Sequence, residues 1–218
     1  MGKLILNQTQ IPREQWRYGL RSSAKTGCGW IALYNALILL GEEPNPETLI
    51  RALEKQLPLI HGNAGTFCLG PALLLKKYGY RVNICSDTQR FDTLVQTSDA
   101  AILYYYWRDG LRIGAHFIAL KWDGTHFVGY TTFTNSTAPD GFGQSLSGYL
   151  RRQGFFGCVL TVLRKISRED IAIPVSLWYN ELAFDEKGFG SLCKQKKCSA
   201  VPVSVLAVCL RPSCWAAY

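Results

Sequence analysis

The sequence predicts an α+β fold in which a layer of N-terminal helices packs against a mostly antiparallel β-sheet. Helical periodicity dominates up to residue 79, and alternating or continuously apolar strand patterns follow from residue 80 to residue 163. Helices that precede a run of strands are typical of α+β domains. At 218 residues the chain is long enough to bury a substantial core.

The first predicted helix follows Thr26 and ends at Gly41. It begins at Cys28, which lies between two glycines, and about three turns of almost wholly apolar residues follow. A helix N-terminus presents free N–H groups and a partial positive charge, which together stabilise a thiolate. Because the thiolate is the nucleophilic form of cysteine, Cys28 is the candidate nucleophile. The alternative is a small buried cysteine that only caps a core helix.

Two further helices complete the predicted helical layer. Asn45 followed by Pro46 is a helix start signal, and it predicts an amphipathic helix over residues 46–56. Residues 71–78 form another helix, which Gly79 ends. Beyond it we expect strands over 80–85, 100–107, 115–122, 126–133 and 155–163, with short helices over 91–96 and 145–152.

His116 is the candidate base for Cys28. It begins an apolar strand in the context GAHFIAL, where small residues leave space beside the ring. The other histidines are His61, in a glycine-rich loop, and His126, just after the hairpin signal Asp123–Gly124. A hydrogen-bonded core histidine is the alternative interpretation of His116.

An imidazole base also needs a third group that fixes its orientation. With a two-residue turn at Asp123–Gly124, His116 lies opposite Thr131, and another register brings Thr132 opposite instead. Neither is a carboxylate or an amide. Asn135, just past the strand end, is the nearest side chain of that type and is the predicted orienting residue.

Acyl transfer to a thiol also requires donors for an oxyanion. The backbone N–H of Cys28 at the start of its helix is one candidate. The polar side chains of Gln15, Ser22 and Ser23, which precede that helix, are candidates for the second donor.

The motifs GCGWIALYNAL and GAHFIALKWDGTHFVGY resemble those of papain-like cysteine peptidases, in the bacterial branch that contains bacteriocin leader-processing (double-glycine) peptidases. The resemblance covers residues 14–163 and implies a papain-like fold. By position it implies that Cys28 is the nucleophile, His116 the base and Asn135 the orienting residue. The implied reaction is hydrolysis of a peptide or small amide through a thioester, with no cofactor.

The chain departs from that family at two positions. Such enzymes usually have a Gln six residues before the Cys, where this chain has Ser22, and a carboxylate or amide about sixteen residues after the His, where it has Thr132. Two alternatives to hydrolysis therefore stay open. One is acyl transfer to an amine, as in a transpeptidase, and the other is a non-catalytic peptide-binding module with a degraded site.

Charge and hydropathy argue against other function classes. The net charge is +8, but the basic residues are scattered and Lys194, Lys196 and Lys197 form the only tight run, so no nucleic-acid partner is expected. The sequence has no run of 18 apolar residues, so no membrane span is expected, and the N-terminus lacks a signal-peptide pattern. We therefore expect a cytoplasmic protein whose eight cysteines are free thiols, while the oligomeric state is not predicted.

The periodic patterns end near Lys165, which predicts a peptidase domain over residues 1–165 and a Cys-rich extension over 166–218. Four cysteines crowd into the extension, namely Cys193, Cys198, Cys209 and Cys214. Their spacing is looser than that of paired zinc ligands and no His lies nearby. A poorly ordered extension is therefore expected in preference to a zinc site.

Overall fold

The computed structural model describes residues 2–56, 65–155 and 157–164. The loop that contains His61 and the predicted extension 166–218, with its four cysteines, lie outside the described residues. The division into a domain over 1–165 and an extension therefore stays a prediction.

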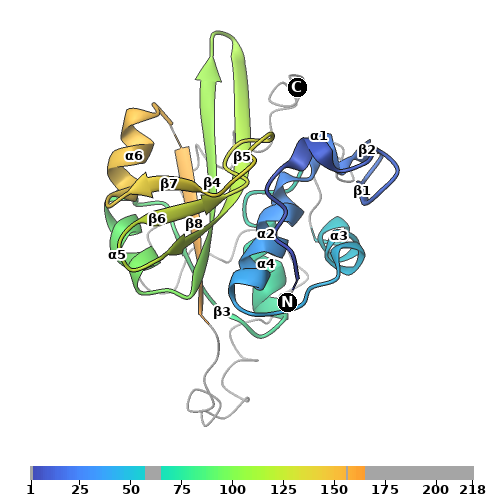
Figure 1. Cartoon of the computed structure of the whole chain (residues 1–218), viewed down its shortest axis with the longest axis horizontal. Coiled ribbons are helices and arrows are strands. Elements are labelled where there is room, and N and C mark those ends of the chain that lie inside the picture. Colours follow the sequence, from blue (N-terminus) through green and yellow to red (C-terminus); the bar gives the residue numbers. More distant parts are fainter. Residues whose placement is uncertain (1, 57–64, 156, 165–218) are drawn as a thin grey trace, which may run out of the picture.

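The described residues form the α+β architecture that the sequence predicts, with a β-sheet between two groups of helices (Figure 1). Helices α1 to α4 lie on one side of the sheet, and α5 and α6 lie on the other. The helices are α1 (Ser23–Thr26), α2 (Cys28–Leu39), α3 (Pro46–Glu54), α4 (Gly70–Lys77), α5 (Phe91–Gln96) and α6 (Leu146–Arg152), and short 3-10 helices span η1 (Gln8–Gln10) and η2 (Thr88–Arg90).

The main sheet has six strands in the order β3-β8-β4-β5-β6-β7, and all of these described pairings are antiparallel. These strands are β3 (Arg81–Cys85), β4 (Ala100–Asp109), β5 (Arg112–Trp122), β6 (Phe127–Tyr130), β7 (Asp140–Gly143) and β8 (Gly157–Arg164). A small hairpin of β1 (Arg17–Tyr18) and β2 (Arg21–Ser22) precedes α1. The strands β4 and β5 form the long hairpin that extends beyond the rest of the sheet in Figure 1.

Helix α2 is the central helix of the core, as its apolar sequence predicts. Trp30 is fully buried, and its ring contacts Trp16 and Tyr34 edge-on, with centroid distances of 5.7 and 6.4 Å. Its indole N–H donates to the hydroxyl of Ser23 at 2.9 Å. The helix ends where Gly41 adopts a φ of 81°, a conformation that glycine accepts without strain.

The sheet is buried on both faces, which explains the continuous apolar run in β4. Phe117 and Ala119 of β5 pack in one cluster with α2. Ile118 and Leu120, which alternate with them, pack in a second cluster with α5 and α6. Successive side chains of a strand point to opposite faces, so each residue of β5 belongs to one of the two cores.

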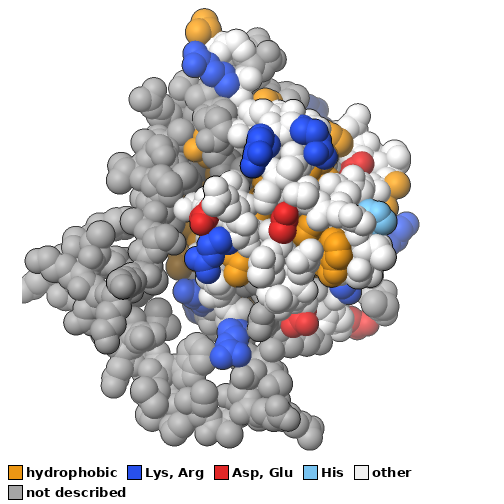
Figure 2. Space-filling view, turned by 90° about the vertical axis from the view of Figure 1, so that its left-hand side faces the viewer, with side chains coloured by type: hydrophobic (Ala, Val, Ile, Leu, Met, Phe, Trp, Pro, Cys, Tyr) orange, Lys and Arg blue, Asp and Glu red, His pale blue; other side chains and the backbone are white. Residues whose placement is uncertain are grey.

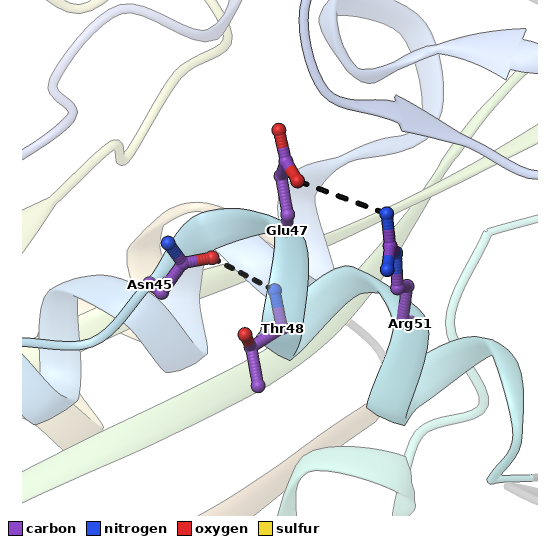
Figure 3. A network of polar contacts seen from close by, with 4 residues as sticks. All are labelled: Asn45, Glu47, Thr48 and Arg51. Carbon is purple, nitrogen blue, oxygen red and sulfur yellow. Dashed lines mark hydrogen bonds and ion pairs between the residues drawn. The ribbon is translucent and has the colours of Figure 1, made fainter.

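Helix α3 begins as its start signal predicts (Figure 3). The Asn45 side chain accepts a hydrogen bond from the N–H of Thr48 at 3.0 Å, and Pro46 occupies the first turn. Glu47 and Arg51 form an ion pair at 3.8 Å one turn apart. Both side chains are exposed, so this pair contributes little to stability.

The β5–β6 hairpin turns one residue later than the Asp123–Gly124 signal predicts. The N–H of Asp123 donates to the carbonyl of His126 at 3.1 Å, which places Gly124 and Thr125 at the centre of the turn. The Asp123 carboxylate accepts the N–H groups of Thr125 and His126 at 2.8 and 2.7 Å, and this local bonding fixes the later turn. The predicted register, in which His116 lies opposite Thr131, is therefore wrong.

Strand β6 is also shorter than the predicted strand 126–133. It ends at Tyr130, which pairs with Ala119, and Thr131 then adopts a φ of 62°. Helix α1, the β1–β2 hairpin and β7 were not predicted, because elements of two to four residues are too short to show a period.

The surface shows no concentration of one charge on the face drawn in Figure 2, where Lys and Arg side chains are spread among uncharged ones. Within the described ranges, no helix combines the length and the apolarity that crossing a bilayer requires.

Candidate active site

Cys28 is the first residue of α2, and its side chain is half-buried. The backbone N–H groups of Cys28 itself, Gly29 and Phe117 face the sulfur and favour its charged form. The first two are free donors of the helix N-terminus, while Phe117 comes from β5. The candidate nucleophile thus lies where the central helix meets the sheet.

The two glycines beside Cys28 allow close packing around it. A Cβ atom at Gly27 would lie 2.5 Å from the carbonyl of Ser23. A Cβ atom at Gly29 would lie 2.2 Å from the hydroxyl of Thr66. Both distances are too short for any side chain, so close packing alone requires the two glycines of the GCG motif.

We expect Gly29→Ala to destabilise the protein although alanine is the better helix former. Alanine gains about 1 kcal/mol in a helix interior and less at Gly29, the second residue of α2, whereas forcing an extra carbon against buried Thr66 costs about 1–3 kcal/mol. Urea unfolding followed by circular dichroism measures the net loss. Gly141→Ala is the matched control, because a Cβ atom there meets nothing within 4 Å. Equal unfolding midpoints for the two variants would contradict the packing argument.

Burial governs the protonation state of Cys28. It raises the pKa of the thiol to about 11, and the three N–H groups offset only part of this shift. Cys28 is therefore a neutral thiol near pH 7. The helix N-terminus that the sequence predicts is present, but it does not by itself produce the thiolate expected there.

His116 is a buried residue of β5 whose ring nitrogen Nε2 lies 2.7 Å from the carbonyl oxygen of Thr131. A carbonyl only accepts hydrogen bonds, so Nε2 carries the proton and Nδ1 keeps its lone pair. Burial lowers the pKa of His116 to about 4, although the Thr131 carbonyl favours the charged ring. Near pH 7 the ring is a neutral imidazole in one tautomer, which is the form that a general base requires.

The Cys28 sulfur faces the N–H of Phe117, the residue that follows His116. The side chain of Phe117 faces α2, whereas His116 shares the opposite face with Tyr105, at a ring centroid distance of 6.0 Å. Within the described residues no hydrogen bond joins Cys28 to His116. The Cys28 sulfur thus lies against the backbone of β5 at Phe117, while the neighbouring His116 side chain lies on the other face, in a part of β5 that the described pairing with β6, which begins at Ala119, does not include.

Thr131, and not Asn135, makes the hydrogen bond to the ring of His116. Asn135 is exposed, and its carbonyl accepts a hydrogen bond from the side chain of Asn7 at 3.3 Å. The carbonyl of Thr132 accepts the hydroxyl of Tyr105 at 2.9 Å. Of the two threonines that the sequence offered as alternatives, Thr131 therefore bonds to the ring, and it acts through its backbone.

The predicted second oxyanion donors differ in their availability. Ser23 is buried, and its hydroxyl donates to the carbonyl of Trp16 and accepts from Trp30. Ser22 is half-buried and makes no capping bond to α1, while Gln15 is exposed. Ser23 therefore serves the packing of Trp30, which leaves Ser22 and Gln15 as candidates.

Tyr18 is a polar group near Cys28 that was not predicted to belong to the site. It is fully buried, and its oxygen accepts the hydroxyl of Thr66 at 3.1 Å. Burial raises its pKa to about 12, and the negative charge of a Cys28 thiolate contributes to that shift. The phenol therefore keeps its proton throughout the neutral range, and an isolated tyrosine carries no sequence signal for such a place.

The sequence matches no protein-family model and no curated protein. Solved structures that resemble the fold include a double glycine motif protease from an AMS/PCAT transporter in complex with the leader peptide. It has 12% identity, covers 73% of this chain and 95% of that chain, and gives a TM-score of 0.43. A second is the peptidase domain of Streptococcus ComA, a bi-functional ABC transporter. It has 15% identity, covers 68% of this chain and 100% of that chain, and gives a TM-score of 0.43. A third is the Pseudomonas avirulence protein AvrPphB. It has 11% identity, covers 62% of this chain and 89% of that chain, and gives a TM-score of 0.36.

Proposed function

We propose that this chain is a thiol-dependent amide or peptide hydrolase in which Cys28 is the nucleophile and His116 the base. One observation carries the proposal: Nε2 of His116 lies 2.7 Å from the carbonyl oxygen of Thr131, which leaves Nδ1 free to accept a proton, and the next residue along β5 presents its N–H to the Cys28 sulfur. The resemblance of the two motifs around Cys28 and His116 to papain-like cysteine peptidases supports the same assignment.

The proposed reaction begins with both groups neutral. Nδ1 of His116 takes the thiol proton while the Cys28 sulfur forms a bond to the substrate carbonyl carbon. The N–H groups of Cys28 and Gly29 stabilise the resulting oxyanion. The imidazolium then returns the proton to the leaving amine as the C–N bond breaks, and water hydrolyses the thioester that remains.

A non-catalytic peptide-binding domain is the second candidate function. The observation that favours it is the absence, within the described residues, of a hydrogen bond between Cys28 and His116. Catalytic hydrogen bonds are often long in unliganded enzymes and shorten only when substrate binds. The two functions differ in whether His116 controls the reactivity of Cys28.

The rate of labelling by iodoacetamide tests whether His116 controls the reactivity of Cys28. Between about pH 5 and pH 9 both groups start neutral, so proton transfer from Cys28 to His116 supplies a thiolate fraction that does not change with pH. We expect this contribution to make the labelling rate of Cys28 in the wild-type protein exceed the rate in His116→Gln near pH 5, and the relative difference to shrink as the pH rises toward 9. In His116→Gln the labelling rate should be lower than in the wild-type protein near pH 5. It should rise tenfold for each unit of increasing pH, because only hydroxide then removes the thiol proton. Mass spectrometry of digested peptides measures the rate at each cysteine.

His126→Gln is the control for loss of a histidine, because His126 is exposed and lies in the β5–β6 turn. The buried thiols Cys68 and Cys85 provide the internal reference for slow labelling. Identical rate profiles for the wild-type protein and His116→Gln would rule out the proposed base and favour the peptide-binding function.

A further inference from the structure

The N-terminal segment, residues 2–10, runs along α2 toward its N-terminal end (Figure 1). The carbonyl of Lys3 accepts the hydroxyl of Tyr34 at 3.2 Å, on the second half of the helix. Further along the segment, the Gln8 side chain donates to the carbonyl of Ala24 at 3.2 Å, in α1. The segment thus connects the helices that carry the nucleophile to the start of the chain.

Asn35 joins this segment to α2 through its side-chain amide. It is fully buried, and its oxygen accepts the N–H of Ile5 at 2.9 Å while its nitrogen donates to the carbonyl of Ile5 at 2.8 Å. The same nitrogen donates to the hydroxyl of Thr131 at 3.0 Å. A buried amide with three partners specifies one geometry, because the loss of any partner leaves a polar group without water.

Thr131 completes the connection to the base. Its hydroxyl donates to the carbonyl of Ile5 at 2.5 Å and accepts from Asn35, and the residue is fully buried. Its φ of 62° is rare for a β-branched residue, so the surrounding contacts must hold it there. In this conformation its carbonyl oxygen lies 2.7 Å from Nε2 of His116.

We propose that Asn35 and Thr131 are positioning residues that, together with Ile5, hold the Thr131 carbonyl against His116 and so fix the ring in the tautomer that leaves Nδ1 free. This inference rests on the proposed function, because it gives the tautomer a catalytic purpose. The backbone carbonyl does what an Asn or Asp side chain does in other histidine sites. Neither residue touches the reacting atoms, and both act through His116.

The hydroxyl of Thr131 is the group to remove. In Thr131→Val the branched shape stays while the bonds to Ile5 and Asn35 are lost. We expect the Nε2–H tautomer of His116 to lose population, as seen in ¹⁵N ring chemical shifts of the full chain. The pH-independent contribution of His116 to the labelling of Cys28 by iodoacetamide should fall by about tenfold or more. Thr131→Ser restores the hydroxyl and should keep both properties at their wild-type values.

Asn7→Ala is the matched control in the same segment, because it removes the hydrogen bonds to Asn135 and Thr9 without touching Thr131. It should leave the tautomer and the labelling unchanged. Thr131→Ala removes the same hydroxyl without a branched side chain, and it replaces the valine variant if that variant does not fold.

The tautomer measurement does not depend on catalysis, which separates this inference from the proposed function. A wild-type tautomer in both Thr131→Val and Thr131→Ala would overturn the positioning role even if Cys28 labelling depends on His116. Conversely, a tautomer change that serine prevents would support the positioning role even if labelling proved independent of His116.

Discussion

Replacing Trp30 with alanine is expected to lower the free energy of unfolding by about 3–5 kcal/mol. The indole is fully buried, contacts the rings of Trp16 and Tyr34, and bonds to Ser23. Alanine would leave a cavity at the start of α2 and deprive a buried hydroxyl of one partner. Chemical denaturation at pH 7, followed by circular dichroism, measures the loss.

Leu20→Ala is the control for Trp30→Ala, because Leu20 is 77% exposed. We expect it to change the free energy of unfolding by less than about 0.5 kcal/mol. If Trp30→Ala cost no more than this surface substitution, the assignment of α2 as the central helix of the core would be wrong.

Acidification from pH 6.5 to pH 4 is expected to cost about 3 kcal/mol of stability through His116 alone. The pKa of the ring is about 4 in the folded protein and 6.5 as a model value, so in this window the unfolded chain binds more protons. Stability therefore rises with pH between these values and is lost as the pH falls. Below about pH 4 both states are protonated and the contribution of His116 no longer changes.

Carboxylates titrate in the same window, so the His116 contribution is the difference between two proteins. The unfolding free energies of the wild-type protein and His116→Gln should converge by about 3 kcal/mol as the pH falls from 6.5 to 4. His126→Gln, which removes an exposed histidine, should instead follow the wild-type curve. Parallel curves for wild type and His116→Gln would show that burial does not suppress protonation of the ring.

Periodicity over many residues made the fold predictable. The helix that begins at Cys28, the central strand from Ala100 and the helix start at Asn45 all carry long or strongly local signals, and the structure confirms each of them. The β5–β6 turn was mispredicted by one residue. There the bonds that decide the register come from the carboxylate of Asp123, which captures two backbone N–H groups after the expected position.

The site was less predictable because residue types reveal side chains and not backbone groups. The search for an amide or carboxylate led to Asn135, whereas a carbonyl of the chain itself bonds to His116. Any residue supplies a carbonyl, so no residue type marks it. The pKa values of Cys28 and His116 likewise depend on how deeply the finished fold buries them.

The hydrogen bond between Thr131 and Ile5 spans 126 positions along the chain. Closing so long a loop costs conformational entropy before the contact can compensate for it, so such contacts form late in folding. During synthesis, Ile5 leaves the ribosome long before Thr131 exists to meet it. We therefore expect the nascent chain to lack the Thr131 hydrogen bond to the imidazole of His116 until the chain has been synthesised past β6.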